Sequence, residues 1–482
     1  MLSDHMVLQR ERAVPIWGKA GPEAQISVSF AGEVATTTAD DVGNWRIDIP
    51  TGAASSDGRT LTIAEAGGET IELTDVLVGE VWHASGQSNM RWTMNRLDHM
   101  KPEVAAAEHP EVRVFMHPHT AADAPRFANG GEWRVCAPET AGDFSAVAYF
   151  FARELNTALD VPVGLVVTPW GGASAEAYVT PESFATLPGS AEYAERITQR
   201  RAQAQADADA AGEELTNHSP RLRGARIQNV PSVLYHGMVE PVAPVAKRGV
   251  IWYQGESNAT RADGYDELMR LLIEDWRSRW NQPGEHREFP FLAVQLANFR
   301  APIADPNEEG WGPVRQAQLD TATHHPNTYL ATAVDIGEAD DIHPGNKQEV
   351  GRRLALIALR RVYEIDGLID QGPTFVAGEP VEPDDAGRGR MRLRFDHAAG
   401  LATKDGEAPR GFAVRASDSD TWRWAPVAAI DGDAMLVTAP AGVVAPFDVR
   451  YGWGNNPTDG PHGINLINSA GLPAFPFQAL VE

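Results

Sequence analysis

The stretch VLVGEVWHASGQSNMRW, from Val76 to Trp92, decides the fold of this 482-residue chain. Its first eight residues are mostly apolar and predict a buried β-strand. Polarity changes abruptly at Gly86, Gln87 and Ser88, as it does where a strand turns into a helix. A buried strand that ends on a small hydroxyl-bearing segment is either an ordinary turn or a segment that presents Ser88 for chemistry.

The chain around this stretch divides into three parts. Residues 1–78 alternate apolar and polar side chains with period two, as in Gln25–Phe30 and Trp45–Ile49, and predict a sandwich-like N-terminal β domain. Residues 79–368 alternate short apolar strands with amphipathic helices, which predicts an α/β domain. Residues 369–482 return to period-two alternation and predict a C-terminal β domain.

The middle part is predicted to contain one five-stranded parallel sheet with helices on both faces, because its strands alternate with helices. The predicted strands are Val76–His83, Val163–Thr168, Gly249–Tyr253, Phe289–Leu296 and Tyr329–Ile336. The helices between them repeat apolar residues every three or four positions. The segment Arg200–Glu214, rich in Ala, Asp, Gln and Glu, is interpreted as a mobile or helical excursion outside the core.

Composition excludes several classes of protein. The net charge is 41 − 66 = −25, so the surface repels nucleic acid and anionic membranes, and it slows polyanionic substrates unless the site is locally basic. The single cysteine, Cys136, excludes an internal disulfide and a cysteine-rich metal site. No apolar run is long enough to predict insertion into a membrane, and the start, MLSDHMVLQR, lacks the pattern of a signal peptide.

Ligands of open parallel sheets bind beyond the carboxyl ends of the strands. The segments that follow four of the predicted strands are Gly86–Met90, Trp170–Ala173, Gln254–Asn258 and Glu338–Pro344. They supply a hydroxyl, a glycine pair, an amide, carboxylates and an imidazole. Together these groups are the parts of a serine hydrolase.

The residue types predict the roles in such a site. Ser88 is the candidate nucleophile, and His343 is the candidate base because an imidazole titrates near working pH. A carboxylate has to hold the imidazole in one tautomer, and Asp340 and Asp341 both lie close before the histidine.

The oxyanion formed during acyl transfer needs preorganised donors. The candidates are the backbone N–H of Ser88, a backbone N–H of Gly171 or Gly172, and the side-chain amide of Gln254. The pattern Gly-X-Ser-X-Gly is not satisfied because Met90 stands at its last position, so an α/β-hydrolase elbow is not supported.

Four motifs resemble the sialate O-acetylesterase family, which lies within the SGNH hydrolases. They are Gly86-Gln87-Ser88-Asn89-Met90, Trp170-Gly171-Gly172, Trp252-Tyr253-Gln254-Gly255-Glu256-Ser257-Asn258 and Asp341-Ile342-His343-Pro344. The segments Ser3–Arg10 and Tyr451–Trp453 also resemble this family, so the resemblance covers essentially the whole chain.

The resemblance implies a flavodoxin-like sheet and an esterase that uses no metal or other cofactor. It implies that Ser88 is the nucleophile, that His343 is the base, and that Asp340 orients the base, with Asp341 and Glu256 as alternatives for this acid. Gln254 stands where SGNH hydrolases usually have an oxyanion-hole asparagine.

The resemblance also implies contacts with substrate. Asn89 and Trp170 lie within the matched motifs and are expected to help bind the substrate. The expected substrate is an acetylated carbohydrate, either a plant glycan such as xylan or xyloglucan or an O-acetyl sialic acid. A sialate carboxylate would need an arginine near Ser88, and Arg91 is the candidate, with simple surface solvation as the alternative.

The family suggests export to the periplasm or beyond the cell. Two other functions remain open at this point: a glycan-binding protein with an inactive hydrolase core, and a metal-dependent phosphoesterase. The second would need clustered ligands, and the chain offers one such cluster, formed by Asp340, Asp341 and His343.

Overall fold

The computed structural model describes residues 1–127, 130–280 and 288–480. It separates the chain into two compact units. The first consists of Met1–Gln254 and Arg270–Phe291, and the second of Gly255–Met269 and Leu292–Glu482. The division into three domains at residues 78 and 368 stays a prediction.

The first unit begins with β-strands that enclose a small core. These strands are β1 (Val7–Gln9), β2 (Ala13–Lys19), β3 (Gln25–Phe30), β4 (Glu33–Thr38), β5 (Asn44–Pro50) and β6 (Ser55–Glu65). Strand β2 pairs with β5, and β3 pairs with β4 and β6. Alternate residues such as Ile16, Val28 and Ile47 are buried in one shared core. The two sheets confirm the β structure predicted from period-two alternation.

Strand β7 (Thr70–Gly86) contains the stretch that decides the fold, and it is longer than predicted. Its first part pairs with β6, and the part from Glu80 to Gly86 lies parallel to both β10 (Val163–Val167) and β11 (Gly249–Tyr253). One continuous strand therefore crosses the predicted domain border at residue 78.

The sheet around β7 is mixed. Strand β8 (His109–Met116) lies parallel to β10, and β9 (Trp133–Cys136) pairs antiparallel with β8, which gives the order β11-β7-β10-β8-β9 in the first unit. Strands β8 and β9 were not predicted from the sequence. The fold is thus α/β, with a large mixed sheet and additional β-sheets.

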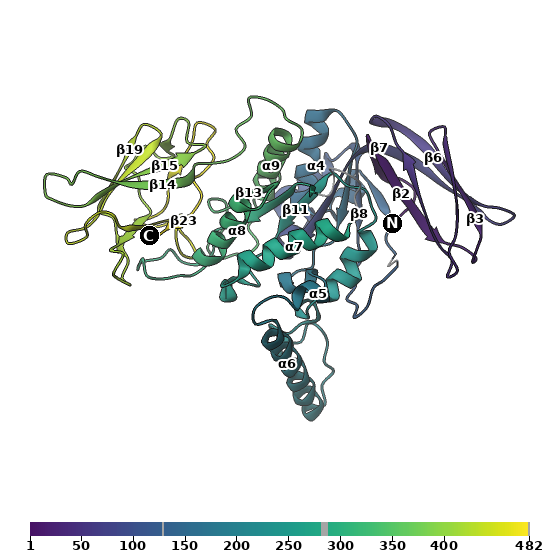
Figure 1. Ribbon diagram of the computed structural model, residues 1–482, viewed down its shortest axis with the longest axis horizontal. Coiled ribbons are helices and arrows are strands. Elements are labelled where there is room, and N and C mark those ends of the chain that lie inside the picture. The colour runs from purple at the N-terminus through teal and green to yellow at the C-terminus, as the bar shows by residue number, and fades with distance from the viewer. Residues whose placement is uncertain (128–129, 281–287, 481–482) are drawn as a thin grey trace. The chain divides into compact units, whose positions relative to one another are not determined.

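The helices bury the predicted apolar faces. The helices up to α7 are α1 (Ser88–Arg91), α2 (Lys101–Ala105), α3 (Pro138–Ala141), α4 (Ala146–Leu159), α5 (Pro181–Phe184), α6 (Ser190–Ala211) and α7 (Tyr265–Arg279). Helix α4 packs on β8 and β10 with Val147, Phe151 and Leu155 fully buried. Helix α6 extends away from the sheet of the first unit (Figure 1), which confirms a helical excursion in the segment around residues 200–211.

The second unit places two helices next to a short strand. Strand β13 (Thr328–Thr332) lies beside β12 (Phe291–Gln295) and contacts both α8 (Gly312–His324) and α9 (Lys347–Ile357). A π-helical turn, Ala358–Val362, follows α9 directly.

The second unit also contains the C-terminal β-sheets, drawn in yellow-green and yellow in Figure 1. One sheet has the order β14-β15-β20-β19 and another the order β18-β17-β21-β23, and β16 pairs with β22. Their bounds are β14 (Thr374–Val381), β15 (Arg390–Asp396), β16 (Ala402–Thr403), β17 (Phe412–Arg415), β18 (Arg423–Trp424), β19 (Val427–Asp431), β20 (Ala434–Thr438), β21 (Asp448–Tyr451), β22 (Leu466–Ile467) and β23 (Phe477–Ala479). Across the described residues of both units, no helix is both long enough and apolar enough to span a bilayer.

Candidate active site

Ser88 is the point at which the buried stretch reaches the surface. From Val76 to Gln87 every residue is buried, and Asn89 and Met90 are buried again, whereas Ser88 is partly exposed. It begins α1 directly after the end of β7, and its carbonyl accepts the N–H of Trp92 at 2.8 Å. Between Val76 and Met90, Ser88 is the one residue with access to solvent, which is compatible with presentation of its hydroxyl.

Gly86 makes the turn before Ser88 possible. Its φ is +128°, a conformation that side chains with a Cβ rarely adopt, and a Cβ at this position would collide with the carbonyl oxygen of Tyr253. The N–H of Gln87 donates to this same oxygen at 2.9 Å, and the N–H of Trp170 donates to the Gly86 carbonyl at 3.1 Å. The turn therefore joins the carboxyl ends of β7, β10 and β11.

Replacing Gly86 by alanine is expected to lower the free energy of unfolding by more than about 2 kcal/mol. The new Cβ collides with the Tyr253 carbonyl, and alanine is strained at a φ that glycine adopts freely. Urea unfolding followed by tryptophan fluorescence measures the change. Gly67 is the matched control, since its φ is +75° but no atom lies within 4 Å of an added Cβ. Equal losses in the Gly86→Ala and Gly67→Ala variants would contradict the role of the Tyr253 contact.

The glycine pair after β10 lies beside Ser88. A Cβ added to Gly171 would be 3.5 Å from the Cβ of Ser88, which is van der Waals contact. Two buried side-chain amides hold this loop: Gln228 donates to the Gly171 carbonyl at 3.0 Å, and Asn229 donates to the Gly172 carbonyl at 2.9 Å. Sequence reasoning missed both amides, because they lie 57 residues away in a segment with no recognised motif.

The other predicted residues of the first unit differ in exposure. Gln254 is fully buried at the end of β11, and its amide donates to the Ala173 carbonyl at 3.2 Å, so it ties β11 to the glycine loop. Asn89 is only 1% exposed, which favours an internal role over contact with substrate. Trp170 is half-buried and stacks on His119 with 4.4 Å between ring centroids.

The second unit holds the predicted base. His343 lies in the segment between β13 and α9, and 22% of its side chain is exposed. Its backbone N–H donates to Oδ1 of Asp341 at 2.8 Å, and the same oxygen lies 3.7 Å from the ring Nδ1. Asp340 is exposed. The approach of His343 to Ser88 stays a prediction, as do the catalytic roles of the residues named here.

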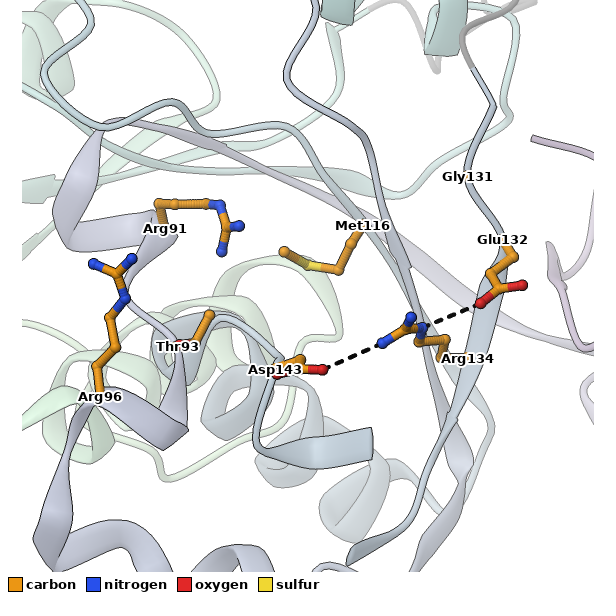
Figure 2. A pocket seen from close by; sticks show the side chains of 8 residues that line it. All are labelled: Arg91, Thr93, Arg96, Met116, Gly131, Glu132, Arg134 and Asp143. Atoms are coloured by element: carbon orange, nitrogen blue, oxygen red, sulfur yellow. Dashed lines mark hydrogen bonds and ion pairs between the residues drawn. The ribbon is translucent and has the colours of Figure 1, made fainter. Parts of the chain in front are cut away.

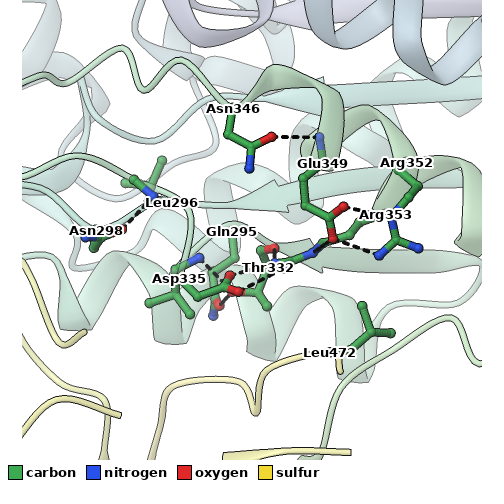
Figure 3. Close-up of polar contacts among 12 residues, drawn as sticks. Gln295, Leu296, Asn298, Thr332, Asp335, Asn346, Glu349, Arg352, Arg353 and Leu472 are labelled. Atoms are coloured by element: carbon green, nitrogen blue, oxygen red, sulfur yellow. Dashed lines mark hydrogen bonds and ion pairs between the residues drawn. The ribbon is translucent and has the colours of Figure 1, made fainter. Parts of the chain in front are cut away.

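A network of charged and polar groups fixes the start of the His343 segment (Figure 3). Arg353 on α9 forms two bonds to Asp335, of 2.7 and 2.9 Å, and donates to the Thr332 carbonyl at 2.7 Å. Glu349 accepts from Arg353 at 2.8 Å, and its own N–H is capped by Asn346 at 3.1 Å. A buried arginine paired with two partly buried carboxylates in this way holds a loop in one geometry.

Lys347 is a further group that the sequence did not single out. Its side chain is fully buried at the first position of α9, and burial lowers its pKa to about 7, although the charges of Glu256, Asp341 and Glu338 oppose that shift. Lys347 therefore places a titratable amine in the electrostatic neighbourhood of two of the candidate acids, Asp341 and Glu256. Across the described residues, no group of three or more His, Cys, Asp or Glu side chains is arranged to hold a metal ion.

Comparisons with known proteins relate the chain to carbohydrate esterases. A family model described as carbohydrate esterase, sialic acid-specific acetylesterase, matches residues 212–360. The sialate O-acetylesterases of Mus musculus and Homo sapiens are each 27% identical over the whole of this chain, which covers 94% and 92% of them. The crystal structure of a carbohydrate acetylesterase from Xanthomonas citri is 35% identical, with a TM-score of 0.83, over 100% of this chain and 98% of that one.

Proposed function

Because the chain belongs to the sialate O-acetylesterase family of carbohydrate esterases, we propose that it removes O-acetyl groups from carbohydrates through a covalent acetyl-enzyme. The chain is an esterase, and the proposal adds the serine mechanism and the residues. The observation that carries it is the exposure of Ser88 between buried neighbours, next to the glycine pair.

The first half of the reaction transfers the acetyl group to the enzyme. Ser88 Oγ attacks the acetyl carbonyl while His343 Nε2 takes the hydroxyl proton. The negative charge on the carbonyl oxygen is stabilised by the backbone N–H of Ser88, with a backbone N–H of Gly171 or Gly172 as a further donor, while the fully buried Gln254 holds the glycine loop through its bond to the Ala173 carbonyl. Collapse of this intermediate breaks the ester bond, and His343 returns the proton to the departing sugar oxygen.

The second half regenerates the enzyme. A water molecule attacks the acetyl-Ser88 ester while His343 removes one of its protons, and acetate leaves as Ser88 Oγ is reprotonated. The imidazole needs a carboxylate beside Nδ1 in both halves. The contacts of Asp341 with His343 support Asp341 in this role rather than Asp340, and Glu256 remains an alternative.

The test is whether Ser88 becomes covalently modified during turnover. We expect the protein to release acetate from p-nitrophenyl acetate and from acetylated sugars, and a fluorophosphonate to inactivate it. Peptide mass spectrometry should locate that adduct on Ser88. Binding of acetylated glycan without acetate release or labelling would contradict the esterase mechanism and favour a glycan-binding protein with an inactive core.

A further inference from the structure

A buried tyrosine hydroxyl joins the turn that carries Ser88 to the glycine loop. Tyr178 ends a short 3₁₀ helix, Ala175–Tyr178, that follows this loop, and its side chain is fully buried. The hydroxyl donates to the Gly86 carbonyl at 2.8 Å and accepts the N–H of Trp170 at 3.0 Å. It therefore connects the end of β7 to the loop after β10, and each of these two segments holds part of the proposed site.

The connection through Tyr178 adds to a longer direct contact. The N–H of Trp170 also donates to the Gly86 carbonyl at 3.1 Å, so this one donor is shared between the carbonyl and the tyrosine oxygen. The Gly86 carbonyl is the nearest acceptor for the tyrosine proton, since the Thr168 carbonyl is 3.3 Å from the same oxygen. Removal of the hydroxyl would leave the turn and the loop joined at this point by the Trp170 N–H alone.

A chain of buried side chains leads from Tyr178 back to His83. Burial raises the pKa of Tyr178, and bonds donated by the Trp170 N–H and the Ser85 hydroxyl oppose that rise. Ser85 Oγ accepts from Thr168 Oγ1 at 3.0 Å, and Thr168 Oγ1 lies 2.6 Å from Nε2 of His83. The side chains of His83, Ser85, Thr168 and Tyr178 are all fully buried, so water does not compete for these bonds.

Donor counting gives the chain one direction. Burial, followed by the charge of Lys247, lowers the pKa of His83 well below its usual range, so the ring is neutral and carries one N–H. Thr168 spends its proton on Ser85, so Nε2 of His83 has to be the donor to Thr168. Nδ1 of His83 has no hydrogen-bond partner among the described residues, which agrees with an unprotonated Nδ1. Each hydroxyl then accepts one bond and donates the next, and bonds aligned in this way strengthen one another in a buried site.

We propose that Tyr178 is a positioning residue of the esterase, whose hydroxyl sets the separation between Ser88 Oγ and the N–H groups of the glycine loop. The buried chain from His83 keeps that hydroxyl aimed at the Gly86 carbonyl. The inference rests on the proposed function, in which Ser88 and a glycine N–H act on the same acetyl carbonyl. Small displacements between such groups cost large factors in rate, so Tyr178 acts on the chemical step and not on substrate binding.

The test is Tyr178→Phe, which removes the hydroxyl and keeps the ring. The limiting rate of inactivation by a fluorophosphonate should fall about 10–100-fold, while the concentration that gives half of this rate changes less than about twofold. This reaction forms a bond to Ser88 Oγ without a later hydrolysis step, so it reports on the attack alone. Turnover of p-nitrophenyl acetate should show the same loss in kcat/KM. A purely structural bond would instead lower the melting temperature and leave the inactivation rate of the folded enzyme unchanged.

The matched control is Tyr149→Phe. Tyr149 is a fully buried tyrosine on α4 of the same unit, and its hydroxyl donates to Glu103 at 2.7 Å. This variant should keep the wild-type inactivation rate, because its hydroxyl has no bond to the turn or the glycine loop.

A second variant, Thr168→Val, tests the chain. It should lower the inactivation rate about 3–10-fold, because the Tyr178 hydroxyl remains but loses part of its orientation. The double variant Tyr178→Phe/Thr168→Val should lie within about twofold of Tyr178→Phe alone, since Thr168 acts through the tyrosine hydroxyl, whereas independent effects would multiply. Thermal melting shows whether each variant is folded, and Thr168→Val tests the inference if Tyr178→Phe is not.

The outcomes separate this inference from the proposed function. A wild-type inactivation rate in folded Tyr178→Phe, or in folded Thr168→Val where the first variant does not fold, would overturn the positioning role and leave the esterase intact. Losses that multiply in the double variant would overturn the chain from His83 as the source of the hydroxyl's direction. A wild-type protein that releases no acetate and is not labelled at Ser88 would overturn the serine mechanism, and the positioning role with it.

Discussion

Replacing Ser88 by alanine is expected to lower kcat for p-nitrophenyl acetate by about 10⁶-fold, since a covalent mechanism loses its acyl acceptor and the base His343 is left with no hydroxyl to activate. The backbone of α1 should be unaffected by this substitution. Ser88 contributes its main-chain carbonyl to the helix, and the N-cap residue Gln87 forms no side-chain cap bond that the variant could disturb. Initial rates of p-nitrophenol release, with acetate measured in parallel, give the ratio.

The control for this variant is Ser278→Ala. Ser278 is a part-buried serine on α7 of the same unit, and its hydroxyl donates to the Asp275 carbonyl. It should keep full activity. A Ser88→Ala enzyme that retains more than about one thousandth of the wild-type rate would contradict a nucleophilic role. Substrate binding and oxyanion donors alone, without the nucleophile, are expected to support a rate far below that level.

The sequence predicted those parts of the fold that follow from local pattern. Period-two alternation located β3 and β5, and apolar spacing located α4, because a residue's burial in these elements follows from its position in the repeat. The abrupt change of polarity near Ser88 predicted the end of a buried strand, and β7 ends at Gly86, two residues before Ser88 begins α1. Strand β8 was missed although Val112 and Val114, on either side of Arg113, carry the same period-two signal.

The remaining site features depend on contacts between distant segments. Gln228 and Asn229 hold the glycine loop through hydrogen bonds to carbonyls, and any residue's carbonyl can accept such a bond, so no local motif marks the donors. The partners of Arg353 are also set by folding, because Asp335 is 18 residues away on the other side of the His343 segment. The hollow of Figure 2 shows the same principle: Arg91 on α1 and Arg134 on β9 come to line one cavity only when the chain folds.

Replacing His343 by alanine is the second large expected effect, a loss of about 10⁴–10⁶-fold in kcat, since the same imidazole accepts and returns the proton in both halves of the reaction. Alanine also removes the group that must be unprotonated to act as the base, so the pH profile of kcat/KM should lose the limb that depends on this proton. Rates measured as a function of pH give both effects. A variant with an unchanged pH profile would contradict His343 as the base.

The neighbouring aspartates decide which carboxylate orients the base. Asp341→Asn should lower kcat by about 10²–10⁴-fold, because an amide beside Nδ1 no longer favours the imidazolium that forms in the transition state. The effect should lie toward the lower end, since 55% of the Asp341 side chain is exposed and water screens its charge. Asp340→Asn removes an equal charge one residue away and should change kcat less than about fivefold. Reversed sizes would restore Asp340 as the acid, and two small effects would point to Glu256, whose carboxylate shares the surroundings of Lys347 with Asp341.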